Sequence, residues 1–162
     1  AQINSAWMLR SVVHGGIKMK ELDIKGRGVF GSEASGEAMV FPNSILGWNG
    51  LDVQTGIVTE EGNVHKGESI KGKIAVMPCS KGSVGWSTFH HLCALNGCGP
   101  AGYTFTKMDS KCATAVLFSK VPCVADFPEN CDPCSLIKDG DRVVLNGETG
   151  VVKIQNSCAH SK

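Results

Sequence analysis

Residues 74–100 read IAVMPCSKGSVGWSTFHHLCALNGCGP, and this stretch predicts the strand-to-helix unit on which the fold depends. The apolar run 74–77 is typical of a buried strand, and Pro78 ends it. From residue 84 to residue 95 the apolar side chains recur at spacings of three and four, which predicts a helix, and the NGCGP segment is a helix stop. A glycine-rich turn that contains Ser83 therefore joins a strand to a helix.

Strand signals dominate the rest of the chain. We expect strands where apolar residues alternate or cluster between glycines, namely at residues 22–27, 37–41, 56–60, 69–78, 102–107, 114–120 and 121–127. Gly72 is a candidate bulge, and residues 107–112 are a candidate helical turn. Residues 141–154 place two β-branched runs around an NGETG loop, which predicts a hairpin. With 20 glycines for tight corners, the pattern favours a single α+β domain in the form of a β-rich barrel.

Length and charge exclude several classes of protein. A chain of 162 residues suits one domain with a substantial core. Sixteen basic against fifteen acidic residues, with no basic stripe, argue against nucleic acid as a partner. No apolar run approaches the roughly 20 residues of a membrane span, so we expect a soluble, cytoplasmic protein. The first twenty residues carry no acidic side chain, and Met19 is a candidate original start.

Eight cysteines raise the question of redox state and metal binding. Their spacing lacks the framework of a small disulfide-rich fold, so we expect reduced thiols. Only Cys131 and Cys134 form a C-x-x-C pair, whereas a structural zinc site normally needs a second pair. Cys123 or Cys158 would have to complete such a site. The prolines around the pair place it in a loop, which argues against a redox motif.

The serine in the turn has two chemical interpretations. A Gly-Ser-x-Gly turn that opens a helix presents backbone N–H groups and a hydroxyl where the helix dipole favours an anion. Alternatively, Ser83 or Ser80 is simply the N-cap of the helix. Lys81 could attract a carboxylate or phosphate, or be an ordinary surface lysine. His90 and His91 are adjacent on the helix and point about 100° apart, so we expect solvated or partly buried histidines without a shared metal.

Five segments carry a further signal through their order and spacing. They are GWNGLDVQTGIV, HKGESIKGKIAVMPCSKGSVGWS, GPAGYTF, KVPCVADF and IKDGDRVVLNGETGVVKI. In this order they resemble the small subunit, or swivelling domain, of the aconitase X family over roughly residues 24–155. The resemblance implies a swivelling β/β/α barrel domain at residues 24–162, preceded by an N-terminal arm or extension at residues 1–23. The chain departs from the family pattern at Asn49, at Trp86 and in its extra cysteines.

The resemblance implies a hydro-lyase with two components. Known members dehydrate mevalonate 5-phosphate or cis-3-hydroxy-L-proline, so the implied partners are a small hydroxy-acid substrate and an aconitase X type large subunit. An iron–sulfur cluster on the large subunit is implied as the cofactor, and none in this chain. The place of Ser83 in KGSVGWS implies that it is the catalytic base. The other implied site residues bind substrate, and they are Lys81, Gly82, Val84, Gly85 and His65.

Two other functions stay open at this level. The chain could be a non-catalytic binding or assembly module with the same barrel, or a domain with a cysteine-bound metal. The face around residues 47–56 and 82–87 is expected to contact the large subunit, because Trp48 and Trp86 are costly to expose. Either hydroxy acid, and either a separate or a fused large component, is compatible with the sequence.

Overall fold

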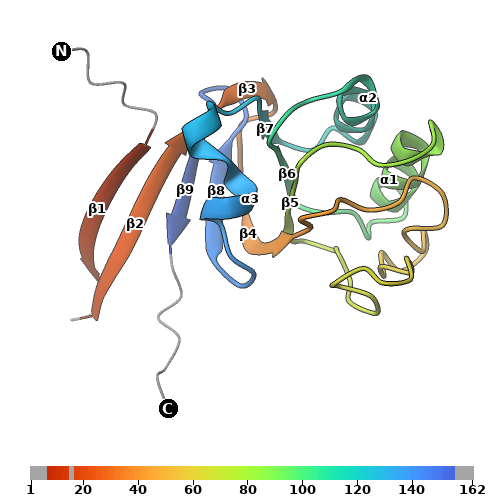
Figure 1. Ribbon diagram of the computed structural model, residues 1–162, viewed down its shortest axis with the longest axis horizontal. Helices are drawn as coiled ribbons and strands as arrows, with labels where there is room; N and C mark the ends of the chain where they lie inside the picture. The colour runs from red at the N-terminus through yellow and green to blue at the C-terminus, as the bar shows by residue number, and fades with distance from the viewer. Residues whose placement is uncertain (1–6, 15–16, 156–162) are drawn as a thin grey trace.

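The computed structural model describes residues 7–14 and 17–155, and within them the chain forms one mixed nine-stranded sheet with three α-helices (Figure 1). The strands are β1 (Trp7–His14), β2 (Ile17–Lys25), β3 (Arg27–Phe30), β4 (Glu33–Val40), β5 (Ile74–Met77), β6 (Gly102–Phe105), β7 (Cys123–Ala125), β8 (Arg142–Asn146) and β9 (Val151–Gln155). The helices are α1 (Gly85–Leu95), α2 (Ser110–Ser119), α3 (Pro133–Leu136) and the 3-10 turn η1 (Glu129–Cys131).

The sheet has an antiparallel and a parallel part, in the order β1-β2-β9-β8-β4-β5-β6-β7-β3. Strands β4, β5, β6 and β7 are parallel neighbours, and α1 and α2 are the crossovers that connect β5 to β6 and β6 to β7. These two helices pack side by side at the end of the molecule opposite the β1–β2 hairpin (Figure 1). No helix in the described part of the chain has the length and apolarity needed to cross a bilayer.

Strand β5 lies between two hydrophobic cores, and all four of its side chains are fully buried. Ala75 and Met77 contribute to the core beneath α1 and α2, which also contains Trp86. Ile74 and Val76 point to the other face, where they join the core formed with β8 and β9. This two-sided burial explains why the strand is a continuous apolar run. It also fixes the position of the turn that follows it.

The predicted α+β class is confirmed, and the strand-to-helix unit occurs as β5 followed by α1. The predicted hairpin is the β8–β9 pair, in which Val143 lies opposite Ile154. Residues 56–60 do not form a strand, because they make only isolated bridges, such as Ile57 with Ser69. Gly72 precedes β5 in a turn with φ of +71°, so it is not a bulge.

The predicted strand at residues 114–120 is wrong, because these residues belong largely to α2. Asp109 caps this helix by accepting hydrogen bonds from the N–H groups of Lys111 and Cys112, each at 2.9 Å. The buried face of the helix consists of Cys112, Ala115 and Val116, which follow the three- and four-residue spacing of a helix. The β-branched and aromatic residues of this segment are thus overridden by a cap and by tertiary packing.

The predicted boundary between the N-terminal arm and the domain falls inside a strand. Strand β2 crosses residue 23 and pairs with β9, with Ile24 opposite Val152. The division into an arm at residues 1–23 and a domain at residues 24–162 stays a prediction. Residues 1–6 and 15–16 of this arm, and Cys158, lie outside the described residues.

Candidate active site

The turn between β5 and α1 lies at the carboxyl end of a parallel strand, the edge of a sheet at which such folds bind ligands. Gly82 has a φ of +80°, a conformation that favours glycine. Helix α1 begins at Gly85 with Val84 at the N-cap position, and no side chain caps it. The N-cap interpretation of Ser83 and Ser80 is therefore wrong. Ser83 is exposed, and its hydroxyl bonds to no group in the described part of the chain.

Ser80 is buried and has a structural partner. Its hydroxyl donates a hydrogen bond to Oδ2 of Asp109, and its N–H donates to the same oxygen at 3.1 Å. Because Oδ1 of Asp109 caps α2, this carboxylate connects the turn after β5 to the first turn of α2. Burial raises the pKa of Asp109, but the hydrogen bonds from Ser80 and Cys112 outweigh burial and hold the pKa below its ordinary value.

The Asp109 carboxylate should contribute measurably to stability. We expect Asp109→Asn to lower the free energy of unfolding by about 1–2 kcal/mol at neutral pH, since an amide NH₂ cannot accept the two hydrogen bonds from Ser80. The folded-state pKa is depressed, so this stabilisation is present above the unfolded value of 3.8 and is lost as the pH falls through the folded value. Urea denaturation of both proteins should converge in acid. A gap that does not narrow as the pH falls below 3.8 would contradict the assignment.

Trp86 lies behind the turn in the core. Its side chain is fully buried, its indole N–H donates to the carbonyl oxygen of Ile45 at 3.0 Å, and its ring stacks on His90 with centroids 3.9 Å apart. Gly47 passes so close that a Cβ there would lie 2.8 Å from the carbonyl oxygen of Ser83. The prediction that Trp86 forms part of a contact face is therefore wrong.

Two exposed apolar side chains lie at the turn. Trp48 is 64% exposed and Val84 is 83% exposed. Trp48 packs edge-on against Phe89 of α1, with ring centroids 5.5 Å apart, so its position relative to the turn is fixed. Large apolar groups gathered in this way around a polar turn are typical of a contact surface.

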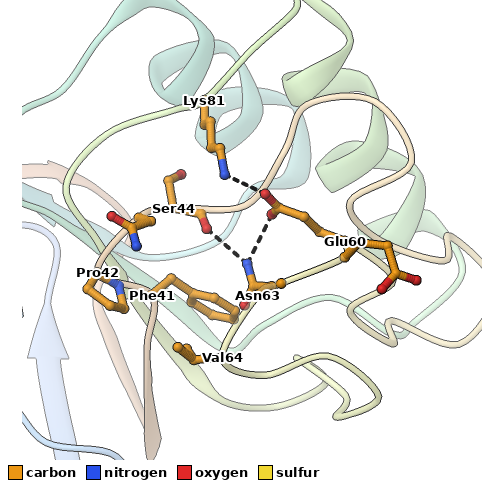
Figure 2. A pocket seen from close by; sticks show the side chains of 10 residues that line it. Phe41, Pro42, Ser44, Glu60, Asn63, Val64 and Lys81 are labelled. Atoms are coloured by element: carbon orange, nitrogen blue, oxygen red, sulfur yellow. Dashed lines mark hydrogen bonds and ion pairs between the residues drawn. The ribbon is translucent and has the colours of Figure 1, made fainter.

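Lys81 faces a polar pocket of about 370 Å³ beside the turn (Figure 2). Its ammonium group forms an ion pair with Glu60, which also accepts hydrogen bonds from the Leu46 N–H at 2.8 Å and from the Asn63 amide at 3.0 Å. Burial raises the pKa of Glu60, but the hydrogen bonds from Lys81 and Asn63 outweigh burial and hold the pKa below its ordinary value. The charge of Lys81 is thus already balanced. Its role in binding a substrate anion stays a prediction that this ion pair does not favour.

His65 makes its contacts elsewhere. It is buried, and its Nε2 lies 2.9 Å from the carbonyl oxygen of Val40 and 3.1 Å from Oδ1 of Asp139. Its ring meets Phe41 edge-on, with centroids 4.9 Å apart. Within the described ranges, none of its hydrogen bonds, ion pairs or ring contacts involves residues 80–87. The structure therefore brings Gly82, Ser83, Val84 and Gly85 together with Lys81, and His65 stays a predicted site residue without a contact to them.

Two other sequence-based expectations need correction. His90 is fully buried, with its Nδ1 2.7 Å from the hydroxyl of Tyr103, and burial lowers its pKa to about 3. The C-x-x-C pair lies in helical turns: Cys131 ends η1, and Pro133 opens α3. Burial raises the pKa of Cys134 to about 11, which is unsuited to a redox thiolate.

Sequence reasoning missed two residues at the start of α2 that reach the turn. One is Asp109, which an N-cap search would have found if residues 110–119 had been interpreted as a helix. The other is Lys111, whose Nζ donates a hydrogen bond to the carbonyl oxygen of Gly82 at 2.8 Å. Its approach depends on the packing of α2 beside α1, for which the sequence holds no local signal.

Comparison with known proteins identifies the family. Residues 23–154 match the family described as "Aconitase X swivel domain". The phosphomevalonate dehydratase small subunit of Methanocella arvoryzae is 32% identical over 82% of this chain and 99% of its own length. The protein of the same name from Methanosarcina mazei is 34% identical over 84% of this chain and 93% of its own length.

A solved structure shares most of the fold. The crystal structure of Thermococcus kodakaraensis aconitase X, in its holo-form, superposes with a TM-score of 0.75 and 32% identity, over 82% of this chain and 97% of that one. The mixed sheet with its two crossover helices is thus the fold of an aconitase X swivel domain. The chain belongs to the aconitase X swivel domain family. The predicted family is confirmed, and these relatives are components of the predicted class of enzyme, a dehydratase.

Proposed function

We propose that this chain is the small subunit of a phosphomevalonate dehydratase. One observation carries the proposal: relatives of that name are 30–34% identical to this chain and are matched over 93–99% of their own length. Their name favours mevalonate 5-phosphate over the other hydroxy acid that the resemblance implies, cis-3-hydroxy-L-proline. The chain then works only together with a large subunit.

In the proposed reaction, Ser83 is the base. Its alkoxide takes the proton from the carbon next to the substrate carboxylate, and the electron pair of that C–H bond becomes the second bond of a C=C as the hydroxyl leaves. The departing hydroxide and the proton taken by Ser83 together make water. A serine is a credible base only where its anion is stabilised in a water-excluded site. The exposed Ser83 hydroxyl, between Gly82 and Gly85, permits close approach of a substrate and a second subunit.

The family resemblance also implies an iron–sulfur cluster, which would accept the leaving hydroxyl. Within residues 7–14 and 17–155, no three His, Cys, Asp or Glu side chains are grouped as metal ligands. The residues described here therefore do not fit such a cluster. We therefore place the cluster on the large subunit.

The apolar rim of the turn is the proposed contact with the large subunit. In hydroxyl-radical footprinting, we expect Trp48 to become protected when the large subunit binds, because its 64% exposed side chain lies beside Ser83. Trp7 is the matched control, since it is 54% exposed on β1 at the opposite end of the sheet (Figure 1). Protection of Trp7 with none at Trp48 would place the interface elsewhere.

The proposed function is tested by reconstitution. The chain should dehydrate mevalonate 5-phosphate when co-purified with its large subunit, and neither component should do so alone. Cis-3-hydroxy-L-proline serves as the competing substrate in the same assay. A complex that forms but dehydrates neither compound would favour the binding-module alternative. Stoichiometric iron and sulfide in the isolated chain would favour the metal-domain alternative and would overturn the assignment of the cluster.

A further inference from the structure

Two lysines lie at the Ser83 turn, and their ammonium groups differ in their electrostatic surroundings. The ammonium group of Lys81 is paired with Glu60, whose side chain is only 10% exposed. Lys111 reaches the turn from α2, where its Nζ donates to the carbonyl oxygen of Gly82 at 2.8 Å. Because that carbonyl is bonded directly to the Ser83 nitrogen, the Lys111 ammonium is held one peptide unit from the proposed base.

The charge of Lys111 is not balanced within the described residues. No carboxylate there lies within 4.0 Å of its ammonium, since the ion pairs of the structure involve other cations. Asp109, two residues earlier, forms no ion pair with this ammonium, and its carboxylate instead accepts hydrogen bonds from Ser80 and from the N–H groups of Lys111 and Cys112. An ammonium group has three N–H donors, and Gly82 accepts from one of them. The remaining donors can bind an anion.

We infer that Lys111 binds the carboxylate of the substrate beside Ser83, an inference that rests on the proposed function. The proton that Ser83 removes comes from the carbon bonded to the carboxylate. The carboxylate is therefore the anionic group of the substrate that lies nearest to a cation beside Ser83. The phosphate of mevalonate 5-phosphate is attached at the far end of its carbon chain. Lys111 therefore contacts the carboxylate, and the phosphate is bound elsewhere.

This placement also serves the reaction. As the C–H bond breaks, negative charge spreads onto the carboxylate oxygens, so an ammonium group there binds the transition state more tightly than the substrate. The hydrogen bond to Gly82 holds the ammonium in place before the substrate arrives, which limits the reorganisation needed during the reaction. Substitution of Lys111 should consequently affect both kcat and KM.

The test uses the complete complex with the large subunit. We expect Lys111→Met to lower kcat/KM for mevalonate 5-phosphate about 10- to 50-fold, the scale of one lost hydrogen bond to a charged group. Lys111→Arg, which keeps the charge, should recover part of this loss. Lys71→Met is the control, because Lys71 is exposed before β5, at the end of the strand opposite the turn, and should keep wild-type kinetics.

Two competitive inhibitors identify the group that Lys111 binds. Mevalonate has the carboxylate without the phosphate, and butyl phosphate has a phosphate without the carboxylate. For Lys111→Met we expect the inhibition constant of mevalonate to rise about 10-fold and that of butyl phosphate to change less than about 2-fold. A selective loss of butyl phosphate binding, or kinetics like those of the wild type, would overturn the inference. So would a fall in kcat with both inhibition constants unchanged, because Lys111 would then only brace the turn.

The two proposals fail in different ways. A wild-type complex without dehydration of mevalonate 5-phosphate would refute the proposed function. An active wild-type complex with an unaffected Lys111→Met variant would refute only the inference. Thermal unfolding and co-elution with the large subunit confirm that each variant is folded and assembled.

Discussion

A complex that carries Ser83→Ala is expected to turn over mevalonate 5-phosphate at least ~100-fold more slowly than the wild type, the usual scale for loss of a general base. The substitution removes one exposed oxygen that has no hydrogen-bond partner in the described part of the chain. The free energy of unfolding should therefore change by less than about 0.5 kcal/mol. Substrate binding should survive better than turnover, because the hydroxyl acts mainly in the transition state. Single-turnover kinetics with the purified complex measure both quantities.

Ser87 supplies the matched control for this experiment. It lies in the first turn of α1, one helical turn beyond Ser83, and its hydroxyl bonds only to the carbonyl oxygen of Val84, at 3.3 Å. Ser87→Ala should keep most of the turnover. Ser80 is unsuited as a control, because its hydroxyl bonds to Asp109 and its loss would disturb the turn itself. A Ser83→Ala complex with near-normal turnover, or a Ser87→Ala complex with the larger loss, would identify a different base.

The turn could be located from sequence because its determinants are local. An apolar run, a proline, and a three- and four-residue spacing lie within 27 consecutive residues, and they correspond to β5 and α1. The β8–β9 hairpin is also determined locally, since the residues of its loop favour the tight turn that joins the two strands. Helix α2 was missed because its β-branched and aromatic residues favour a strand, whereas the Asp109 cap and burial against α1 decide its structure.

The surroundings of Ser83 could not be predicted, because they come from distant parts of the chain. The Glu60 carboxylate that balances Lys81 is 21 residues away in sequence, and Lys111 is 29 residues from Gly82. Neither contact leaves a periodic pattern or a motif. From sequence, Lys81 was the candidate anion-binding lysine because it adjoins the serine, with an ordinary surface lysine as the alternative. In the structure the adjacent Lys81 is paired with Glu60, whereas the distant Lys111 is hydrogen-bonded to the turn.

The two tryptophans near the turn are a second case in which the sequence alone does not predict the surroundings of a residue. Sequence reasoning placed both on a contact face, because both are costly to expose. Only the backbone path separates them: Trp86 points into the core from α1, whereas Trp48 follows the close approach of Gly47 to the turn and stays on the surface. The distinction has consequences that can be measured separately, in stability for one residue and in assembly for the other.

Trp86→Ala is expected to lower the free energy of unfolding by about 3–5 kcal/mol, the range for removal of a fully buried large aromatic side chain. The cavity would lie between the sheet and α1, beside His90 and Phe105, and the carbonyl oxygen of Ile45 would lose the indole N–H that bonds to it at 3.0 Å. Trp86→Phe should recover part of the loss by refilling most of the volume. Urea denaturation of the isolated chain measures each difference.

Trp48→Ala is the matched comparison. We expect it to have a small effect on stability and a large effect on assembly with the large subunit. Its side chain is 64% exposed, so the free energy of unfolding should fall by less than about 1 kcal/mol, mostly from the lost contact with Phe89. The dissociation constant of the complex with the large subunit should instead rise by at least ~10-fold, because an aromatic residue at the centre of an interface commonly contributes more than 1 kcal/mol. If Trp48→Ala destabilises the isolated chain more than Trp86→Ala does, the assignment of core and contact surface around Ser83 is wrong. If it leaves assembly unchanged, the large subunit covers a different face, and the water-excluded site that a serine base requires is not formed at this turn.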